Sequence, residues 1–194
     1  MRTEGRRENA LHLAIVLMMI CVVSASALAF TYQSTVPRIE AHRAEMERAA
    51  MKEVLPDANS FEEVTGEVPR GFIEEAPGLR GAFRGLSGST TVGYVFTVAT
   101  TGYSGDVVSM VGIAQGRITG LEVLRQSETP GLGARIGEAE FRAQFAGLSV
   151  DDTIRTSREG GNIDVIAGAT ISTETVLRGV EIARQAHSRM GEER

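Results

Sequence analysis

The chain has 194 residues, of which 42% are hydrophobic and 23% are charged, and its formal net charge is −5. This length fits one domain with an appendage. One Cys and three His are too few for a disulfide framework, a zinc ribbon or an iron–sulfur ligand set. The acidic balance, with basic residues scattered along the chain, disfavours a nucleic-acid binder, which normally presents a basic face.

An uncharged stretch lies close to the N-terminus, at residues 10–30. A helix of about 20 residues spans roughly 30 Å, the hydrocarbon thickness of a bilayer. We therefore predict an uncleaved transmembrane anchor at 10–31. A buried core helix is one alternative, although this stretch has no polar face. A signal peptide cleaved after Ala27 or Ala29 is another and would release a soluble domain, but the stretch is longer than the usual apolar segment of a signal peptide.

Arginines flank the apolar stretch on both sides. The arginines before the stretch are Arg2, Arg6 and Arg7. The arginines after it, which lie farther from it, are Arg38, Arg43 and Arg48. The nearest flanking charges place residues 1–9 in the cytoplasm, whereas a count out to about 20 residues gives a tie. We predict a cytoplasmic tail at 1–9 and a large domain on the opposite side of the membrane.

A second helix is expected after the anchor. Pro37 can begin a helix, and apolar residues recur close to helical spacing as far as Val54. We predict a stalk helix at 35–56 that continues from the anchor, followed by an extracytoplasmic domain at 57–194.

The pattern of this domain predicts strands before helices. Residues 57–89 are rich in Gly, Pro and Glu and indicate short strands and loops, with Phe72-Ile73 as an apolar piece. Alternating apolar residues then predict a β-meander with strands at 92–98, 107–113 and 118–123. The remaining expected elements are a short helix at 138–145, two short strands joined by Gly160-Gly161, the second at 163–166, and a final helix at 172–190. This order predicts an α+β fold with a mostly antiparallel sheet and packed helices.

A first candidate loop, at 127–133, follows directly after a strand. Its Pro and two Gly fix a tight turn whose amides could approach a flat or anionic ligand, and Glu128 and Thr129 offer an acceptor and a hydroxyl. An ordinary strand-to-helix turn is the alternative. A Rossmann loop is excluded, because the glycine spacing is GxGxxxG and no βαβ unit surrounds it.

A second candidate loop, at 164–172, precedes the final helix. Small residues at 167–169 leave room for a bulky group against the backbone. Thr170 and Ser172 lie where free helix amides point outward, and such a terminus favours a phosphate. A plain helix N-cap supplied by either hydroxyl is the alternative.

The sequence ETPGLG at 128–133, followed by DVIAGAT at 164–170, resembles the FMN-binding domain family. The resemblance covers residues 90–190 and includes GYSG at 102–105. It implies a domain that carries FMN as a phosphoester on the Thr of the second motif, attached by a flavin transferase.

By position, the resemblance makes Thr170 the expected FMN phosphoryl threonine. It assigns transferase recognition to Asp164, Gly168, Ala169 and Thr170. The cofactor-binding residues that it implies besides Thr170 are Glu128, Thr129, Leu132, Gly133, Gly168, Ala169, Ile171 and Ser172. The chain departs from the family at Ala167, where Ser or Thr is usual, so the recognition motif lacks one hydroxyl.

The single span, the short stalk and the total length resemble the G subunits of Rnf complexes, which couple ferredoxin:NAD electron transfer to ion movement across a bacterial membrane. The resemblance implies an electron-transfer flavoprotein subunit in the inner membrane, with its large domain on the periplasmic side and other membrane subunits as partners. Alternatives are the C subunit of the sodium-pumping NADH:quinone reductase, which is disfavoured by the short stalk, and a non-redox anchored binding module. No His, Cys or paired-carboxylate constellation indicates bond-making catalysis, and no metal or nucleic acid is expected.

Overall fold

The computed structural model describes residues 4–192, with side chains described from residue 12 to residue 191. Its first element is one continuous helix, α1 (Glu4–Val54). Pro37 lies inside this helix and does not begin a new one. A proline in a helix interior removes one backbone hydrogen bond, at a cost of about 3 kcal/mol, and here the helix continues on both sides.

Within the described part of the chain, α1 is the one helix that is long and apolar enough to cross a membrane. An 18-residue window in His12–Val54 reaches a mean hydropathy of 2.7, and none of that window is buried. Large apolar side chains along it are exposed, from Leu13 to Phe30. Such a surface suits hydrocarbon better than water.

The chain divides into two compact units, one ending at Glu45 and the other beginning at Met46. The second unit contains a five-stranded sheet in the order β1-β2-β3-β4-β5, with every neighbouring pair antiparallel. Its strands are β1 (Ser60–Glu63), β2 (Leu79–Ser87), β3 (Thr90–Thr101), β4 (Asp106–Ala114) and β5 (Arg117–Arg125). The predicted meander is confirmed as β3, β4 and β5.

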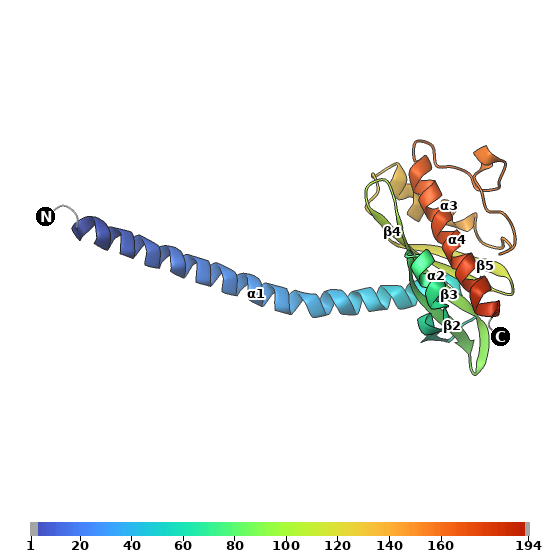
Figure 1. Ribbon diagram of the computed structural model, residues 1–194, viewed down its shortest axis with the longest axis horizontal. Coiled ribbons are helices and arrows are strands. Elements are labelled where there is room, and N and C mark those ends of the chain that lie inside the picture. Colours follow the sequence, from blue (N-terminus) through green and yellow to red (C-terminus); the bar gives the residue numbers. More distant parts are fainter. Residues whose placement is uncertain (1–3, 193–194) are drawn as a thin grey trace. The chain divides into compact units, whose positions relative to one another are not determined.

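The helix α4 (Thr170–Glu192) packs on β3 and β4 and covers one face of the sheet (Figure 1). Its inward face buries Val176, Val180, Ala183 and Ala186 completely. The 3-10 helix η2 (Gly133–Gly137) and α3 (Ala139–Ala143) lie between β5 and α4 in the sequence. The α+β fold with a mostly antiparallel sheet is therefore confirmed.

Two sequence expectations for this unit are wrong. Phe72-Ile73 lie in a helix, α2 (Arg70–Glu75), because Pro69 turns the chain and its carbonyl accepts the Phe72 N–H at 3.0 Å. The two short strands expected around Gly160-Gly161 are also absent from the described residues. The chain there forms a 3-10 turn, η3 (Ser157–Glu159), and a single parallel bridge between Thr156 and Ile163. Gly160 adopts φ 79°, a left-handed conformation that favours a tight turn over a strand.

The last turn of α1 belongs to the second unit and docks onto the sheet through backbone atoms. Thr119 Oγ1 donates a 2.5 Å hydrogen bond to the Val54 carbonyl. Gly112 and Gly120 are register partners on β4 and β5 beneath Val54. A Cβ on Gly112 would collide with the Val54 carbonyl oxygen, and one on Gly120 would lie 3.0 Å from the Val54 Cα. The two glycines therefore permit the close approach of helix and sheet.

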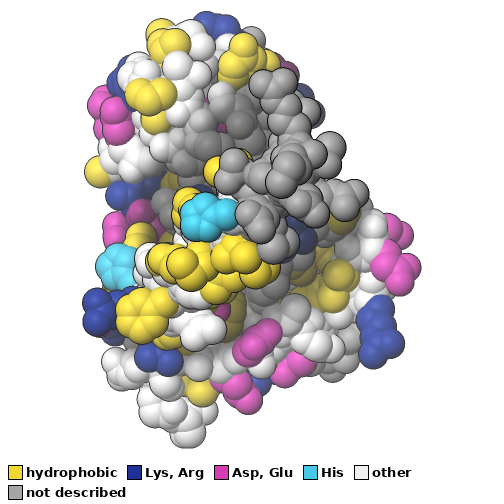
Figure 2. Space-filling model, turned by 90° about the vertical axis from the view of Figure 1, so that its left-hand side faces the viewer, with side chains coloured by type: hydrophobic (Ala, Val, Ile, Leu, Met, Phe, Trp, Pro, Cys, Tyr) yellow, Lys and Arg dark blue, Asp and Glu magenta, His cyan; other side chains and the backbone are white. Residues whose placement is uncertain are grey.

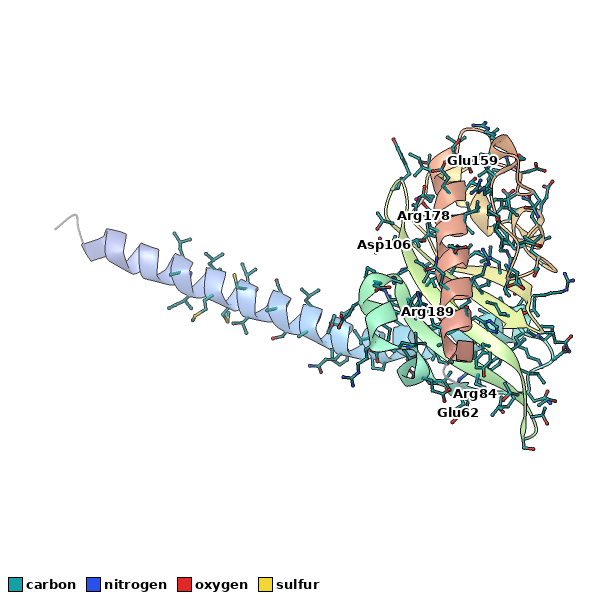
Figure 3. All side chains as sticks on the ribbon, turned by 45° about the vertical axis from the view of Figure 1, so that its right-hand side comes forward. Glu62, Arg84, Asp106, Glu159, Arg178 and Arg189 are labelled. Carbon is teal, nitrogen blue, oxygen red and sulfur yellow. The ribbon has the colours of Figure 1, made fainter. Side chains whose placement is uncertain are left out.

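Several acidic and basic side chains of the described residues form ion pairs. Acidic and basic groups are intermixed on the side shown in Figure 2. Arg84 on β2 pairs with Glu62 of β1 at 3.4 Å and with Glu67 at 2.5 Å (Figure 3).

Candidate functional site

A pocket of about 490 Å³ lies at the end of the sheet where α4 begins. Its volume is within the range of small-molecule sites, about 300–1,000 Å³. Three segments line it: the β3–β4 hairpin loop, the loop after β5 and the start of α4. The lining residues are Tyr103, Glu128, Thr129, Leu132, Gly133, Gly168, Ala169, Thr170, Ile171 and Ser172. The structure thus brings together all nine residues expected from the two loops.

Glu128 joins the three segments. It is 4% exposed, and its Oε1 accepts the backbone N–H groups of Tyr103 at 2.8 Å and of Ser104 at 3.2 Å. Its Oε2 accepts a hydrogen bond from Ser172 Oγ at 2.7 Å. A buried carboxylate is costly unless it is hydrogen-bonded, and here both oxygens have partners. Glu128 therefore fixes the walls of the pocket relative to one another.

Glycines make room for this carboxylate. A Cβ on Gly102 would collide with Glu128 Oε1. A Cβ on Gly133 would collide with Ser172 Oγ and would lie 2.8 Å from Glu128 Oε2. The second Gly of the ETPGLG loop is thus required by packing around Glu128.

The start of α4 does not use the expected hydroxyls as caps. The first helical hydrogen bond runs from the Thr173 N–H to the Ala169 carbonyl at 3.0 Å, so Ala169 occupies the N-cap position. Thr173 Oγ1 binds the turn before the helix, accepting the Ile166 N–H at 3.3 Å. Ser172 donates to Glu128, while Thr170 Oγ1 accepts a 3.3 Å hydrogen bond from Nη1 of Arg158. The amides of 170–172 precede the first helical bond and are available to an anion.

Asp164 and Ala167 lie apart from the pocket lining. Both are exposed, and the Asp164 N–H donates to Gln144 Oε1 at 2.7 Å. The loop that carries them precedes α4 without a strand, contrary to the expected strand at 163–166. The motif thus presents Asp164 to solvent and its last three residues to the pocket.

Sequence reasoning did not assign two residues of this region. Tyr103 lines the pocket with its side chain 70% exposed, and Arg158 reaches Thr170 from η3. An aromatic residue between glycines in a hairpin loop was a signal for Tyr103. Arg158 had no comparable signal, because its proximity to Thr170 depends on the turn at Gly160.

The rim of the pocket is apolar at three points: Tyr103, Leu132 (45% exposed) and Ile171 (48% exposed). Thr170 and the free amides of α4 supply the polar end. Among the residues that the structure describes, no group of His, Cys, Asp or Glu could hold a metal ion. The arrangement suits a flat ring with an attached phosphate, so fold and site define an anchored α+β ligand-binding domain.

Comparisons with known proteins identify the family. The FMN-binding domain family matches residues 102–185, and the RnfG N-terminal region matches residues 1–54. The G subunit of an ion-translocating oxidoreductase complex from Methanosarcina acetivorans is 39% identical over 172 residues, which is 87% of this chain and 89% of that protein. The G subunit of the Na(+)-translocating ferredoxin:NAD(+) oxidoreductase complex from Acetobacterium woodii is 35% identical over 92% of this chain and 91% of that protein.

The chain therefore belongs to the family of G subunits of ion-translocating oxidoreductase complexes and contains an FMN-binding domain. A crystal structure of the C subunit of the Na(+)-translocating NADH-quinone reductase from Parabacteroides distasonis has a similar fold, with a TM-score of 0.58. The similarity covers 79% of this chain and 96% of that chain at 16% identity, so it bears on the fold alone.

Proposed function

We propose that this protein is a membrane-anchored electron-transfer subunit that carries FMN as a phosphoester on Thr170. It would relay electrons within an Rnf-type complex that couples ferredoxin and NAD redox chemistry to ion translocation. The observation that carries the proposal is the placement of Thr170, at the first turn of α4 and in a pocket lined by both family motifs. Family membership supports the assembly with other membrane subunits.

The residues of the pocket fit FMN. When bound, FMN supplies one- and two-electron redox chemistry. Leu132 and Ile171 offer apolar contact to a ring system, and the amides at 170–172 would be available to a phosphate on Thr170. Glu128 orders the surrounding loops, and the polar groups near the ring would set its potential. Electron relay requires no acid–base pair in the site.

A covalent bond suits a carrier outside the cytoplasm. Reversibly bound FMN would be lost by mass action where no flavin pool opposes its dissociation. In the attachment step, Thr170 Oγ1 bonds to the phosphorus of a flavin nucleotide activated as a phosphoanhydride. The other phosphate departs as the leaving group, and the hydroxyl proton passes to solvent. A flavin transferase would recognise Asp164, Gly168, Ala169 and Thr170, and the exposure of Asp164 supports its access.

The proposed arrangement places residues 1–9 in the cytoplasm, 10–31 in the bacterial inner membrane and 57–194 on the periplasmic side. The proposed stalk at 35–56 would overlap the second part of α1, which ends at Val54. The unburied apolar helix and the membrane complexes named for the relatives support anchoring. Reporter fusions at each end of the full chain test the orientation: a periplasm-dependent reporter should be active at the C-terminus and inactive at the N-terminus.

The attachment is tested by expressing the full chain with a flavin transferase, denaturing it in SDS and recording ultraviolet fluorescence of the gel band. We expect a fluorescent wild-type band and a dark Thr170→Ala band. Thr129→Ala removes another hydroxyl of the same pocket and should stay fluorescent. Fluorescent Thr170→Ala would refute the site. A dark wild-type band, beside a fluorescent known substrate, would favour a non-redox binding module.

A further inference from the structure

We propose that Arg158 is a positioning residue that holds the phosphate of FMN against the start of α4. The inference rests on the proposed attachment at Thr170. Nη1 of Arg158 donates a 3.3 Å hydrogen bond to Thr170 Oγ1, the oxygen that would become the ester oxygen. The non-bridging oxygens of a phosphate on that atom would lie two bonds away from it, through the phosphorus. The same guanidinium can therefore reach them with a small side-chain movement.

The turn that carries Arg158 is held by buried and backbone contacts. Thr156 is 3% exposed, and its carbonyl accepts the N–H groups of Glu159 and Gly161, each at 2.9 Å. The Ser157 N–H donates to the Ile163 carbonyl at 2.8 Å, which ties the turn to the segment that leads into α4. Figure 3 shows the labelled Glu159 at the end of the domain where α4 begins. The position of Arg158 is thus determined by the fold of the loop.

Glycines allow this turn to close. Gly160 has φ 79°, and a Cβ on Gly161 would collide with the Arg155 carbonyl. The Gly160-Gly161 pair therefore folds the chain back so that Arg158 faces Thr170. The acidic neighbour Glu159 is engaged elsewhere, since its Oε2 accepts a 3.1 Å hydrogen bond from Thr156 Oγ1.

The chemistry favours Arg158 as a phosphate ligand. Attachment removes the hydroxyl proton of Thr170 and leaves a phosphodiester with one negative charge. Guanidinium–phosphate hydrogen bonds are charge-assisted and can be bidentate, so they restrict orientation as well as attract. The free amides of the first turn of α4 approach the phosphate from the helix side. Arg158 would hold the phosphate from the side of η3, which the amides of α4 cannot do.

The test uses the full chain loaded with flavin by the transferase and purified in a detergent without phosphorus. Wild type, Arg158→Gln and Arg158→Lys are compared, with Arg155→Gln as the matched control for an exposed Arg on the same loop. The readouts are the ³¹P chemical shift of the flavin phosphate and the fluorescence anisotropy of the flavin. Each is measured at low salt and at about 1 M salt, where the screening length is about 3 Å.

We expect Arg158→Gln to remain fluorescent in the denatured gel, with a shifted ³¹P resonance and reduced anisotropy that no longer respond to salt. Arg158→Lys should keep part of the salt response, and Arg155→Gln should match wild type. A ³¹P shift and anisotropy equal to wild type in Arg158→Gln would overturn the proposal. So would a dark Arg158→Gln band, because Arg158 would then act in attachment. A dark wild-type band is a different result and refutes the proposed function itself.

Discussion

Ser172 Oγ donates a 2.7 Å hydrogen bond to Glu128 Oε2, and this contact joins the first turn of α4 to the loop after β5. The two residues are far apart in the sequence and belong to the two different candidate loops. Because Glu128 also accepts two amides of the β3–β4 hairpin loop, one carboxylate orders three walls of the pocket. The Ser172 hydroxyl therefore serves first to hold Glu128 in place, and contact with a ligand would be a second role.

Glu128→Ala should lower the free energy of unfolding of the full chain. The change removes the charged acceptor of the Tyr103 and Ser104 amides, and a hydrogen bond to a charged group contributes about 1.5–3 kcal/mol. Thermal unfolding measured by circular dichroism in detergent tests this, with the exposed Glu140→Ala as control. Glu140→Ala should stay within about 0.5 kcal/mol of wild type. Equal midpoints for both variants would contradict the role assigned to Glu128.

Gly133→Ala should destabilise the same junction by a steric route. The added Cβ would press on Ser172 Oγ and on Glu128 Oε2, and overpacking of this kind typically costs about 1–3 kcal/mol. Gly137→Ala is the matched control in the same 3-10 helix, since a Cβ there meets nothing within 4 Å. The two unfolding midpoints should differ clearly, with Gly133→Ala lower. Equal destabilisation of Gly137→Ala would contradict the collision assigned to Gly133, because a Cβ at Gly137 meets no neighbour and Ala has the higher helix propensity.

Tyr103→Ala should change the optical spectrum of the bound flavin while leaving attachment intact. The Tyr103 side chain is 70% exposed at the pocket, so its removal should alter stability by less than about 0.5 kcal/mol. Absorbance and fluorescence of the loaded protein provide the measurement, and the denatured gel reports attachment. An unchanged spectrum would remove Tyr103 from the ring environment.

His187 should make the domain less stable as the pH falls below neutrality. Burial against Tyr94 and Phe96 lowers the pKa of His187 below its ordinary value of 6.5. The unfolded chain then binds a proton more readily than the folded one. Stability is therefore complete above pH 6.5 and is lost as the pH falls through the folded pKa.

The measurement for His187 is the unfolding midpoint of wild type and His187→Gln at about pH 7.5 and about pH 5.5. The wild type should lose more stability than the variant between these two values. Parallel losses in both proteins would assign the acid sensitivity to other groups.

The sequence predicted the parts of the fold that have a strong local pattern. Alternation placed β3, β4 and β5, because each has one face on the core. The helix α2 was missed, since its six residues are too few to establish a helical period and its start depends on Pro69. The strands expected around Gly160 failed because glycine conformation and backbone contacts, which no residue pattern encodes, decided the turn there.

The candidate site was predictable only as far as its two motifs extend. The two candidate loops supplied nine pocket residues, but neither loop indicates that Glu128 and Ser172 touch. That contact depends on how α4 packs on the sheet. Arg158 lies in neither motif, and it reaches Thr170 because the turn at Gly160 reverses the chain. Residues that act through tertiary packing were thus outside the range of sequence reasoning.

The docking of the last turn of α1 onto Gly112 and Gly120 determines where a hinge could lie. Because Val54 is held to the sheet by its own backbone, the short connection after α1 does not serve as a swivel. The part of α1 ahead of Ala50, the first residue of the helix in the buried cluster, does not belong to that cluster. Pro37 interrupts the hydrogen bonds of that part of the helix and marks the point where bending meets least resistance.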